Sequence, residues 1–301
     1  MDLAKLIRRF RVERPDQFTL ADRDPADTGG LDKAATKAMA AESAKKLSGL
    51  QEKLYADGHW AVLIILQGMD AAGKDGVIKH MLSSVDPHGY EVHSFKAPNA
   101  DELAHDFLWR AARRLPGRGK IEIFNRSYYE ECLVVRVHPE LVEPQRLPPQ
   151  LVTERIWQDR FDDIRAFERH LVRSGTLVLK FHLRISKEEQ ARRLLDRLDD
   201  PDKRWKFNKD DVAERELWDE YMAAYEDMIR NTSTPEAAWH VVPADHKLFA
   251  RLVTSAVLVD ALERLDLKFP SIEGEALAQL KNIREALAAQ VPVGGSGLAK
   301  D

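Results

Sequence analysis

Short apolar runs alternate with amphipathic stretches along most of the chain. The apolar, β-prone runs occupy 61–67, 91–95, 121–124, 177–185 and 239–242, and helical spacing of apolar residues marks 31–55, 100–115, 151–172 and 212–230. Runs that are apolar on both faces are typical of parallel sheets, and their alternation with helices is typical of α/β proteins. The pattern therefore predicts an α/β fold with a parallel sheet covered by helices on both faces.

The two ends of the chain differ from this central part. Residues 1–30 are polar and rich in turn residues, which predicts an irregular arm that wraps the domain or a partner subunit. After Pro270 a helical stretch at 273–290 precedes a glycine-rich run at 294–297. We therefore expect an arm over 1–30, one domain over 31–270, and a C-terminal helix with a disordered tail over 271–301.

Charge and cysteine content exclude several classes of function. The net charge is −4 and the pI about 6.2, so no global basic field would hold nucleic acid or an anionic membrane, and a polyanion would need a local basic groove. The single cysteine, Cys132, excludes an intramolecular disulfide and fits a reducing compartment. The longest apolar run, Ala61 to Leu66, is shorter than the roughly 20 residues of a membrane span. A cytoplasmic protein is expected.

A glycine-rich loop follows the first apolar run. It reads Gly68-Met69-Asp70-Ala71-Ala72-Gly73-Lys74-Asp75-Gly76, matches G-x4-G-K, and leads into a helix-like stretch. Glycines let backbone N–H groups approach phosphates closely, and the helix N-terminus adds partial positive charge. Lys74 would supply a full charge. The loop predicts a phosphate site, with a tight strand-to-helix turn as the alternative.

Two carboxylates distinguish this loop from that of an ordinary ATPase. Asp75 stands where Ser or Thr usually follows the lysine and binds Mg²⁺ through its hydroxyl. Asp70 would lie against bound phosphates, which is unfavourable unless a divalent cation lies between them. Asp70 is therefore the first candidate Mg²⁺ ligand, and capping of the following helix is its alternative role.

A second polar cluster follows the third apolar run, as Phe124-Asn125-Arg126-Ser127-Tyr128-Tyr129-Glu130. Ligands bind at the carboxyl ends of strands in open α/β sheets. Arg126 is suited to grip phosphate, whereas Asn125 is a weaker, neutral candidate where many P-loop enzymes carry a metal-binding Asp. Glu130 is a functional candidate whose alternative is a solvated first turn of helix.

Residues at about 188–210 are predicted to form a helical lid. Arg193 and Arg197 are spaced to share one helix face and could clamp a phosphoryl group; a surface ion-pair network with nearby aspartates is the alternative. The string Asn208-Lys209-Asp210-Asp211 matches the guanine-reading N-K-x-D, but no apolar strand precedes it, so it is discounted. The ten histidines show no zinc-binding spacing, so no metal besides Mg²⁺ is expected.

Together, these motifs closely resemble the family-2 polyphosphate kinases, a group of P-loop kinases, over about 10–270. The resemblance rests on G-M-D-A-A-G-K-D-G, on F-N-R-S-Y-Y-E and on the lid stretch. The string F-N-R-S-x-Y-E is similar to that of the class that phosphorylates both AMP and ADP, whereas the ADP-only class has Asp at position 125 and Asn at position 130. The resemblance implies a kinase that moves the terminal phosphate of polyphosphate onto AMP and ADP, or onto GMP and GDP.

The resemblance also implies a set of site residues. The catalytic candidates are Asp70, Lys74, Arg126, Glu130, Arg193 and Arg197, and Mg²⁺, or alternatively Mn²⁺, would be held by Asp70 and Glu130. Phosphate and nucleotide would contact Asn125 and the loop residues Gly68, Met69, Ala71, Ala72, Gly73, Asp75 and Gly76. Apart from the resemblance, Lys79, Lys96 and Arg110 are expected near the strand ends, where they could continue a basic groove for polyphosphate; ordinary surface charges are the alternative. A homo-oligomer is expected. The alternatives are an ATP-dependent nucleoside monophosphate kinase and a non-enzymatic, nucleotide-binding regulatory protein.

Overall fold

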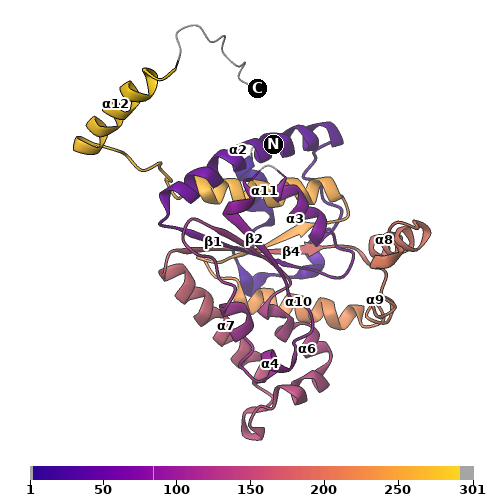
Figure 1. Ribbon diagram of the computed structural model, residues 1–301. Helices are drawn as coiled ribbons and strands as arrows, with labels where there is room; N and C mark the ends of the chain where they lie inside the picture. The colour runs from indigo at the N-terminus through magenta and orange to yellow at the C-terminus, as the bar shows by residue number, and fades with distance from the viewer. Residues whose placement is uncertain (1–2, 84, 292–301) are drawn as a thin grey trace. The chain divides into compact units, whose positions relative to one another are not determined.

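A computed structural model of the chain describes residues 3–83 and 85–291 and confirms the predicted α/β fold (Figure 1). Five parallel strands form one sheet in the order β2-β3-β1-β4-β5. The strands are β1 (Ala61–Gln67), β2 (Tyr90–Ser94), β3 (Ile121–Asn125), β4 (Thr176–Arg184) and β5 (Trp239–Pro243). Every residue of β1 is buried, as expected for a central strand covered on both faces.

Helices cover both faces of this sheet (Figure 1). One face carries α2 (Lys33–Asp57), α3 (Lys74–Leu82) and α11 (Lys247–Glu263), and the other carries α6 (Val134–Val137), α7 (Ile156–Arg173) and α10 (Trp218–Thr232). The helix α11 is apolar around most of its circumference because it packs against α2 and α3 and also against strands β4 and β5.

The predicted helix over 100–115 is broken into α4 (Ala100–Leu103) and α5 (Trp109–Ala112). The side chain of Asp106 accepts a hydrogen bond from the backbone N–H of Leu108 at 2.9 Å. Such a local bond competes with the helical hydrogen bond and interrupts the helix. The predicted lid stretch contains α8 (Lys187–Asp199) and α9 (Asp210–Ala213), joined by a turn at Arg204–Lys206.

The first residues are not irregular as expected, because Leu3–Phe10 forms helix α1. Leu6, Ile7 and Phe10 lie on one side of α1 and are buried, and this packing stabilises a helix that would be too short to form alone. Directly after α1, Arg11 forms an antiparallel bridge with His240 of β5, and Val12 donates its N–H to Trp239 O at 2.9 Å. This segment therefore covers the outer edge of β5.

Beyond Leu267 the chain enters a second compact unit. Its described part holds α12 (Gly274–Ala288), whose leucines and isoleucine are exposed. The glycine-rich end predicted at 294–297 lies outside the described residues. Within the described ranges, no helix is both long enough and apolar enough to cross a membrane.

Candidate active site

The carboxyl ends of three adjacent strands bring the two predicted motifs together. Leu66 of β1 is in register with Asn125 of β3, and Gln67 of β1 with His182 of β4. The loop 68–76 and the segment 125–131 therefore start side by side at one edge of the sheet. This edge is where open α/β sheets bind their ligands.

The loop after β1 requires glycine at two positions. Gly68 has a φ of 153°, and a Cβ there would lie 2.9 Å from the carbonyl oxygen of Leu183. Gly73 has a φ of 107° and caps the start of α3. These positions let the backbone pass close to β4 and then turn into α3, so that the N–H groups at the start of α3 face the loop.

Lys74 folds back over this loop. Its Nζ donates to Gly68 O at 2.7 Å and to Met69 O at 3.2 Å. Burial, with the charge of Arg126 acting in the same direction, lowers the pKa of Lys74 to about 8, although Asp70 and Glu130 partly oppose this change. A bound phosphate would restore the charged form by supplying an anionic partner.

Arg126 lies between the two carboxylates that were predicted to hold metal. Its Nη2 donates to Asp70 Oδ1 at 2.6 Å and its Nη1 donates to Glu130 Oε2 at 2.8 Å. The φ of Arg126 is 62°, which is unusual for a residue other than glycine and often marks a functional position. The second oxygen of Glu130 accepts from Gln67 Nε2 at 2.9 Å.

Opposite charges around Arg126 shift its pKa and that of Asp70 in the direction that favours their charged forms. Glu130 and Asp70 raise the pKa of Arg126 well above its ordinary value, despite burial. Burial alone would raise the pKa of Asp70, but Lys74 and Arg126 together outweigh it, and the pKa of Asp70 lies below its ordinary value. Asp70 therefore carries a negative charge at neutral pH and is available as a ligand for a cation.

A buried ion pair supports the segment that carries Arg126 and Glu130. Lys180 of β4 is fully buried, and its Nζ donates to Glu168 Oε2 at 2.6 Å, to Thr232 O at 2.7 Å and to the hydroxyl of Tyr129 at 3.0 Å. The hydroxyls of Tyr128 and Tyr129 donate to the other oxygen of Glu168 at 2.9 and 2.7 Å. The two tyrosines of the second motif are thus anchored beneath the site.

Arg193 is placed differently from the predicted phosphate clamp. Its Nε donates to Glu189, its Nη1 to the carbonyl oxygens of Ala71 and Ala72 at 3.0 Å, and its Nη2 to those of Ala244 and Asp245. These bonds use all five N–H donors of a guanidinium. In this conformation Arg193 ties the phosphate loop to the end of β5 and has no donor left for phosphate.

Arg197 and the rest of the lid stretch lie across the same region. Arg197 Nη1 pairs with Asp211 Oδ2 at 3.4 Å, a partner that comes from the discounted N-K-x-D string. Asn208 of that string caps the backbone N–H of Asp210 at the start of α9. The string therefore serves the lid's own structure, and it follows no strand.

A cavity of about 640 Å³ lies over the phosphate loop. Lysines and arginines outnumber carboxylates among its lining residues, which provides the local basic groove that a polyanion needs in an acidic protein. Sequence reasoning missed three of these cations, namely Lys203, Lys247 and Arg251. Lys247 and Arg251 stand on the first turns of α11, directly after β5, so the rule that ligands bind at carboxyl strand ends could have found them.

A second, more apolar cavity of about 420 Å³ shares Phe95, Lys96 and Arg126 with the first. Its remaining walls come from the segment 97–110 and from the segment 130–145. Glu130 lines this second cavity, together with Val134, Val135 and Leu141. The two cavities therefore adjoin at Arg126.

Of the remaining predicted phosphate ligands, three line the cavity over the loop and two, Lys79 and Arg110, do not. Lys96 and Asp75 line the cavity over the loop, as does Asn125, whose Nδ2 donates to Asp75 Oδ1 at 2.9 Å. Lys79 is exposed on α3 and is not among the lining residues of that cavity. Arg110 holds the wall of the second cavity, because it donates to Lys96 O at 2.8 Å and lies over the ring of Phe95.

The oxygen atoms at the bridge fit a hard divalent cation. Mg²⁺ is bound in phosphoryl-transfer sites by one or two carboxylates together with water and substrate phosphates. Asp70 has one oxygen engaged by Arg126 and is about one-third exposed, whereas both oxygens of Glu130 are engaged. The Oδ1 of Asn125 is buried without a hydrogen-bond partner and adds another oxygen at the same strand end. Of the two predicted carboxylates, Asp70 is therefore the one with a free oxygen that could hold such a cation, and Glu130 would act through water or after Arg126 turns away.

Comparisons with known proteins agree on one family. The family model described as "Polyphosphate kinase 2 (PPK2)" matches residues 30–270. The chain is 48% identical to the "ADP-polyphosphate phosphotransferase" of Rhodopseudomonas palustris over 81% of this chain and 84% of that protein. It is 44% identical to the "AMP/ADP-polyphosphate phosphotransferase" of Meiothermus ruber over 89% of this chain and 97% of that protein.

A solved structure has the same fold over nearly the whole chain. The crystal structure of polyphosphate kinase 2 from Arthrobacter aurescens superposes with a TM-score of 0.85 at 40% identity, covering 95% of this chain and 97% of that one.

Proposed function

Because this chain belongs to the polyphosphate kinase 2 family, we propose that it transfers the terminal phosphate of inorganic polyphosphate to AMP and ADP. The observation that carries the proposal is the pair of adjoining cavities. One is rich in lysine and arginine side chains and the other is lined mainly by apolar residues, and they meet at Arg126. Such a pair fits one purely anionic substrate and one substrate that has both a base and a phosphate.

The polyphosphate chain would occupy the cavity over the loop. Lys74 and the backbone N–H groups at the start of α3 would hold its terminal phosphate, and Lys247 and Arg251 would contact phosphates further along the chain. Eight lysine and arginine side chains and the phosphate loop make up much of this cavity's lining, and its apolar lining residues are few, namely Ala71, Ala72, Val77, Phe95 and Ala250. This composition favours polyphosphate over ATP as the donor.

The acceptor nucleotide would occupy the second cavity, with its phosphate directed toward Arg126. Apolar side chains such as Val134 and Leu141 offer a surface for the base, and Lys96 and Arg126 lie where the two substrates would meet. A nucleotide phosphate oxygen then attacks the terminal phosphorus of polyphosphate. A new P–O bond forms as the terminal anhydride bond breaks, and the shortened polyphosphate leaves with the bridging oxygen.

In this reaction the protein's contribution is positioning and charge neutralisation. Mg²⁺ bound at Asp70 would neutralise phosphate charge between donor and acceptor. Lys74 and Arg126 hold the reacting phosphates, Arg193 fixes the loop, and Arg197 lies on the lid side of the cavity. No residue forms a covalent intermediate.

A donor panel tests the proposal. Purified protein with Mg²⁺ and AMP is supplied with polyphosphate in one reaction and with ATP in another, and ADP formation is measured. We expect faster transfer from polyphosphate. Transfer from ATP with none from polyphosphate would identify an ATP-dependent monophosphate kinase. Binding of nucleotide without turnover of either donor would identify a regulatory protein.

A further inference from the structure

A buried carboxylate interrupts the otherwise apolar strand β3. Glu122 points from this strand with its side chain 7% exposed, between Ile121 and Ile123, which are buried. Buried strands of parallel sheets are normally continuous apolar runs, and a buried carboxylate needs a charged or hydrogen-bonding partner. Glu122 therefore requires compensation that its own strand does not supply.

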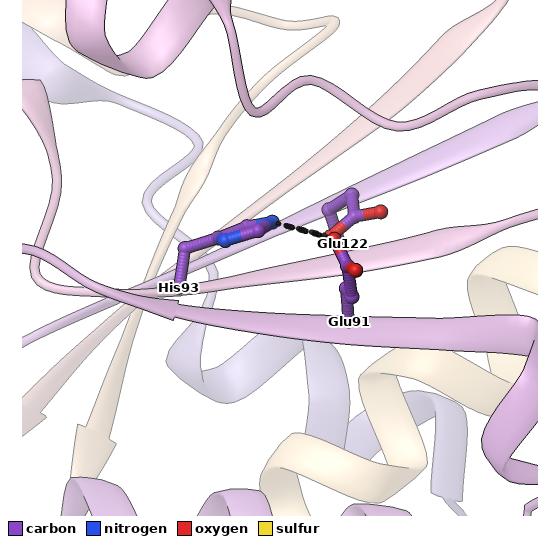
Figure 2. Close-up of side chains that lie close together, drawn as sticks. All are labelled: Glu91, His93 and Glu122. Carbon is purple, nitrogen blue, oxygen red and sulfur yellow. Dashed lines mark hydrogen bonds and ion pairs between the residues drawn. The ribbon is translucent and has the colours of Figure 1, made fainter.

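The neighbouring strand supplies a histidine and a second carboxylate. Glu91 of β2 lies in register beside Glu122, and His93 follows two residues later on the same face of β2. The imidazole Nε2 of His93 lies 2.8 Å from Glu122 Oε2 and 3.3 Å from Glu91 Oε2 (Figure 2). Two carboxylate oxygens from two strands thus converge on one ring nitrogen.

A single proton cannot satisfy this arrangement fully. An imidazole Nε2 carries at most one hydrogen, so it can donate one strong hydrogen bond, and two carboxylates compete for it. The cluster therefore holds more acceptor oxygens than the one N–H of the imidazole Nε2 can serve.

We propose that Glu91, His93 and Glu122 form a site for a divalent transition-metal ion of the Zn²⁺ class. A metal ion can be held by the side chains of His, Cys, Asp and Glu. Among the described residues, Glu91, His93 and Glu122 are the group of three such side chains whose ligand atoms all lie within 4.8 Å of one another. Ligand atoms around a tetrahedral ion with bonds of about 2.0–2.1 Å lie roughly 3.3 Å apart, so the ion needs only small side-chain shifts. Its charge of +2 balances the two carboxylates.

The composition and exposure of the group decide which ion fits. One imidazole nitrogen and two carboxylate oxygens suit Zn²⁺ better than Mg²⁺, which prefers all-oxygen ligands. The side chain of Glu91 is 70% exposed, which leaves an entry path and room for water as a fourth ligand. His93 and Glu122, with side chains 15% and 7% exposed, form the enclosed side.

The position of the site gives the ion a structural role. β2 is an edge strand held to the sheet by β3 alone, and a shared ion would join the two strands through side chains as well. β2 leads directly into Ser94, Phe95 and Lys96, which line the cavity over the loop. An ion here would therefore stabilise the edge strand that carries this wall.

The experiment measures Zn²⁺ binding and needs no assay of activity. Protein treated with chelator is dialysed into millimolar Mg²⁺, which occupies all-oxygen sites, and titrated with Zn²⁺ by calorimetry with parallel thermal melts. We expect one tightly bound equivalent and a rise in Tm of about 5 °C or more at saturating Zn²⁺. His93→Gln and Glu91→Gln should lose that equivalent and the rise, and the exposed position of Glu91 makes its variant safe for folding.

Two matched variants locate the ion. His88→Gln removes another histidine that pairs with a carboxylate, at 3.0 Å from Asp86, and should bind Zn²⁺ as the wild type does. Asp70→Asn should also retain the equivalent, because the catalytic carboxylates lie elsewhere. Co²⁺ in place of Zn²⁺ should give visible d–d absorption in the wild type and lose it in His93→Gln. No binding by the wild type, or binding retained in His93→Gln but lost in Asp70→Asn, would overturn the proposal.

Discussion

Arg126 and Asp70 form an ion pair of 2.6 Å that joins the phosphate loop to the segment after β3 across the strand ends. Because Arg126 also binds Glu130, one guanidinium occupies the space between the carboxylates that were predicted to hold Mg²⁺. A metal ion that binds both Asp70 and Glu130 would need the space that the Arg126 guanidinium now fills. The ion and the guanidinium therefore cannot lie between the two carboxylates at the same time. We infer that substrate and metal binding turns Arg126 from the carboxylates toward phosphate.

Asp70→Asn tests the role of the loop carboxylate. We expect kcat to fall by about 100-fold or more, because the amide has no charge with which to hold Mg²⁺ between the phosphates. Tm should change little, since the lost ion pair is partly exposed and Arg126 keeps Glu130. Asp199→Asn, at the end of α8, is the matched control and should keep full activity. Near-normal turnover of Asp70→Asn would mean that Asp70 only shapes the loop.

Glu130→Asn tests acceptor choice. AMP brings one phosphate fewer than ADP, so a carboxylate on the wall of the nucleotide cavity can replace the missing metal ligands. We expect kcat/KM for AMP to fall at least about tenfold, roughly 1.4 kcal/mol in the barrier, and that for ADP to fall much less. Both acceptors are measured at saturating polyphosphate and several Mg²⁺ concentrations. Equal losses would show that Glu130 does not select the acceptor.

The lowered pKa of Lys74 predicts how phosphate binding depends on pH. The ammonium form attracts phosphate, and the free protein loses this proton as pH rises through about 8. The affinity for tripolyphosphate, measured by calorimetry with chelator present, should vary little between about pH 7 and pH 8, above the pKa of about 6 of a terminal phosphate. Above about pH 8, the affinity should fall by up to about tenfold per pH unit.

Lys74→Arg provides the comparison for this pH profile. A guanidinium stays charged across the range, so any binding by this variant should be almost independent of pH between 8 and 9.5. If the affinity of the wild-type protein for tripolyphosphate does not change up to pH 9.5, Lys74 remains protonated in the free protein.

Arg251→Ala tests the path of the polyphosphate chain beyond the reacting phosphate. Arg251 lines the cavity over the loop but lies on α11, so its removal should weaken polyphosphate binding without disturbing the reacting atoms. We expect KM for long-chain polyphosphate to rise about tenfold while kcat changes less than about twofold. Lys79→Ala, the exposed cation on α3 outside this cavity, should match the wild type. A rise in KM for Lys79→Ala alone would place the chain along the other side of α3.

The strands and the phosphate loop could be predicted because they depend on local sequence. The apolar run at 61–67 matches β1. The G-x4-G-K motif predicted a phosphate loop directly after this strand, and the loop 68–76 lines the cavity there. The break near Asp106 could not be predicted from apolar spacing, since it depends on one side chain that competes for a backbone N–H. Helix α1 was missed because its stability comes from packing against distant residues.

The roles of individual arginines depend on tertiary contacts that no spacing reveals. Arg193 and Arg197 share a helix face as predicted, yet Arg193 is turned inward by carbonyl groups from the loop and from the end of β5. Similarly, Arg110 was expected on phosphate but holds the backbone at Lys96. Sequence identifies which cations gather at the site, and only the fold shows which of them remain available to a substrate.

The bridge between Arg11 and His240 has a consequence for solubility. An open edge strand offers unpaired N–H and C=O groups to other chains and is a common start of aggregation. At β5 the segment after α1 covers part of that edge, where Val12 donates its N–H to Trp239 O, and at the opposite edge β2 exposes the charged side chain of Glu91. A protein lacking residues 1–14 would keep its catalytic groups but would uncover both β5 and the core surface against which Leu6, Ile7 and Phe10 pack. Insoluble expression of such a shortened chain would therefore reflect an exposed core and sheet edge and not a damaged active site.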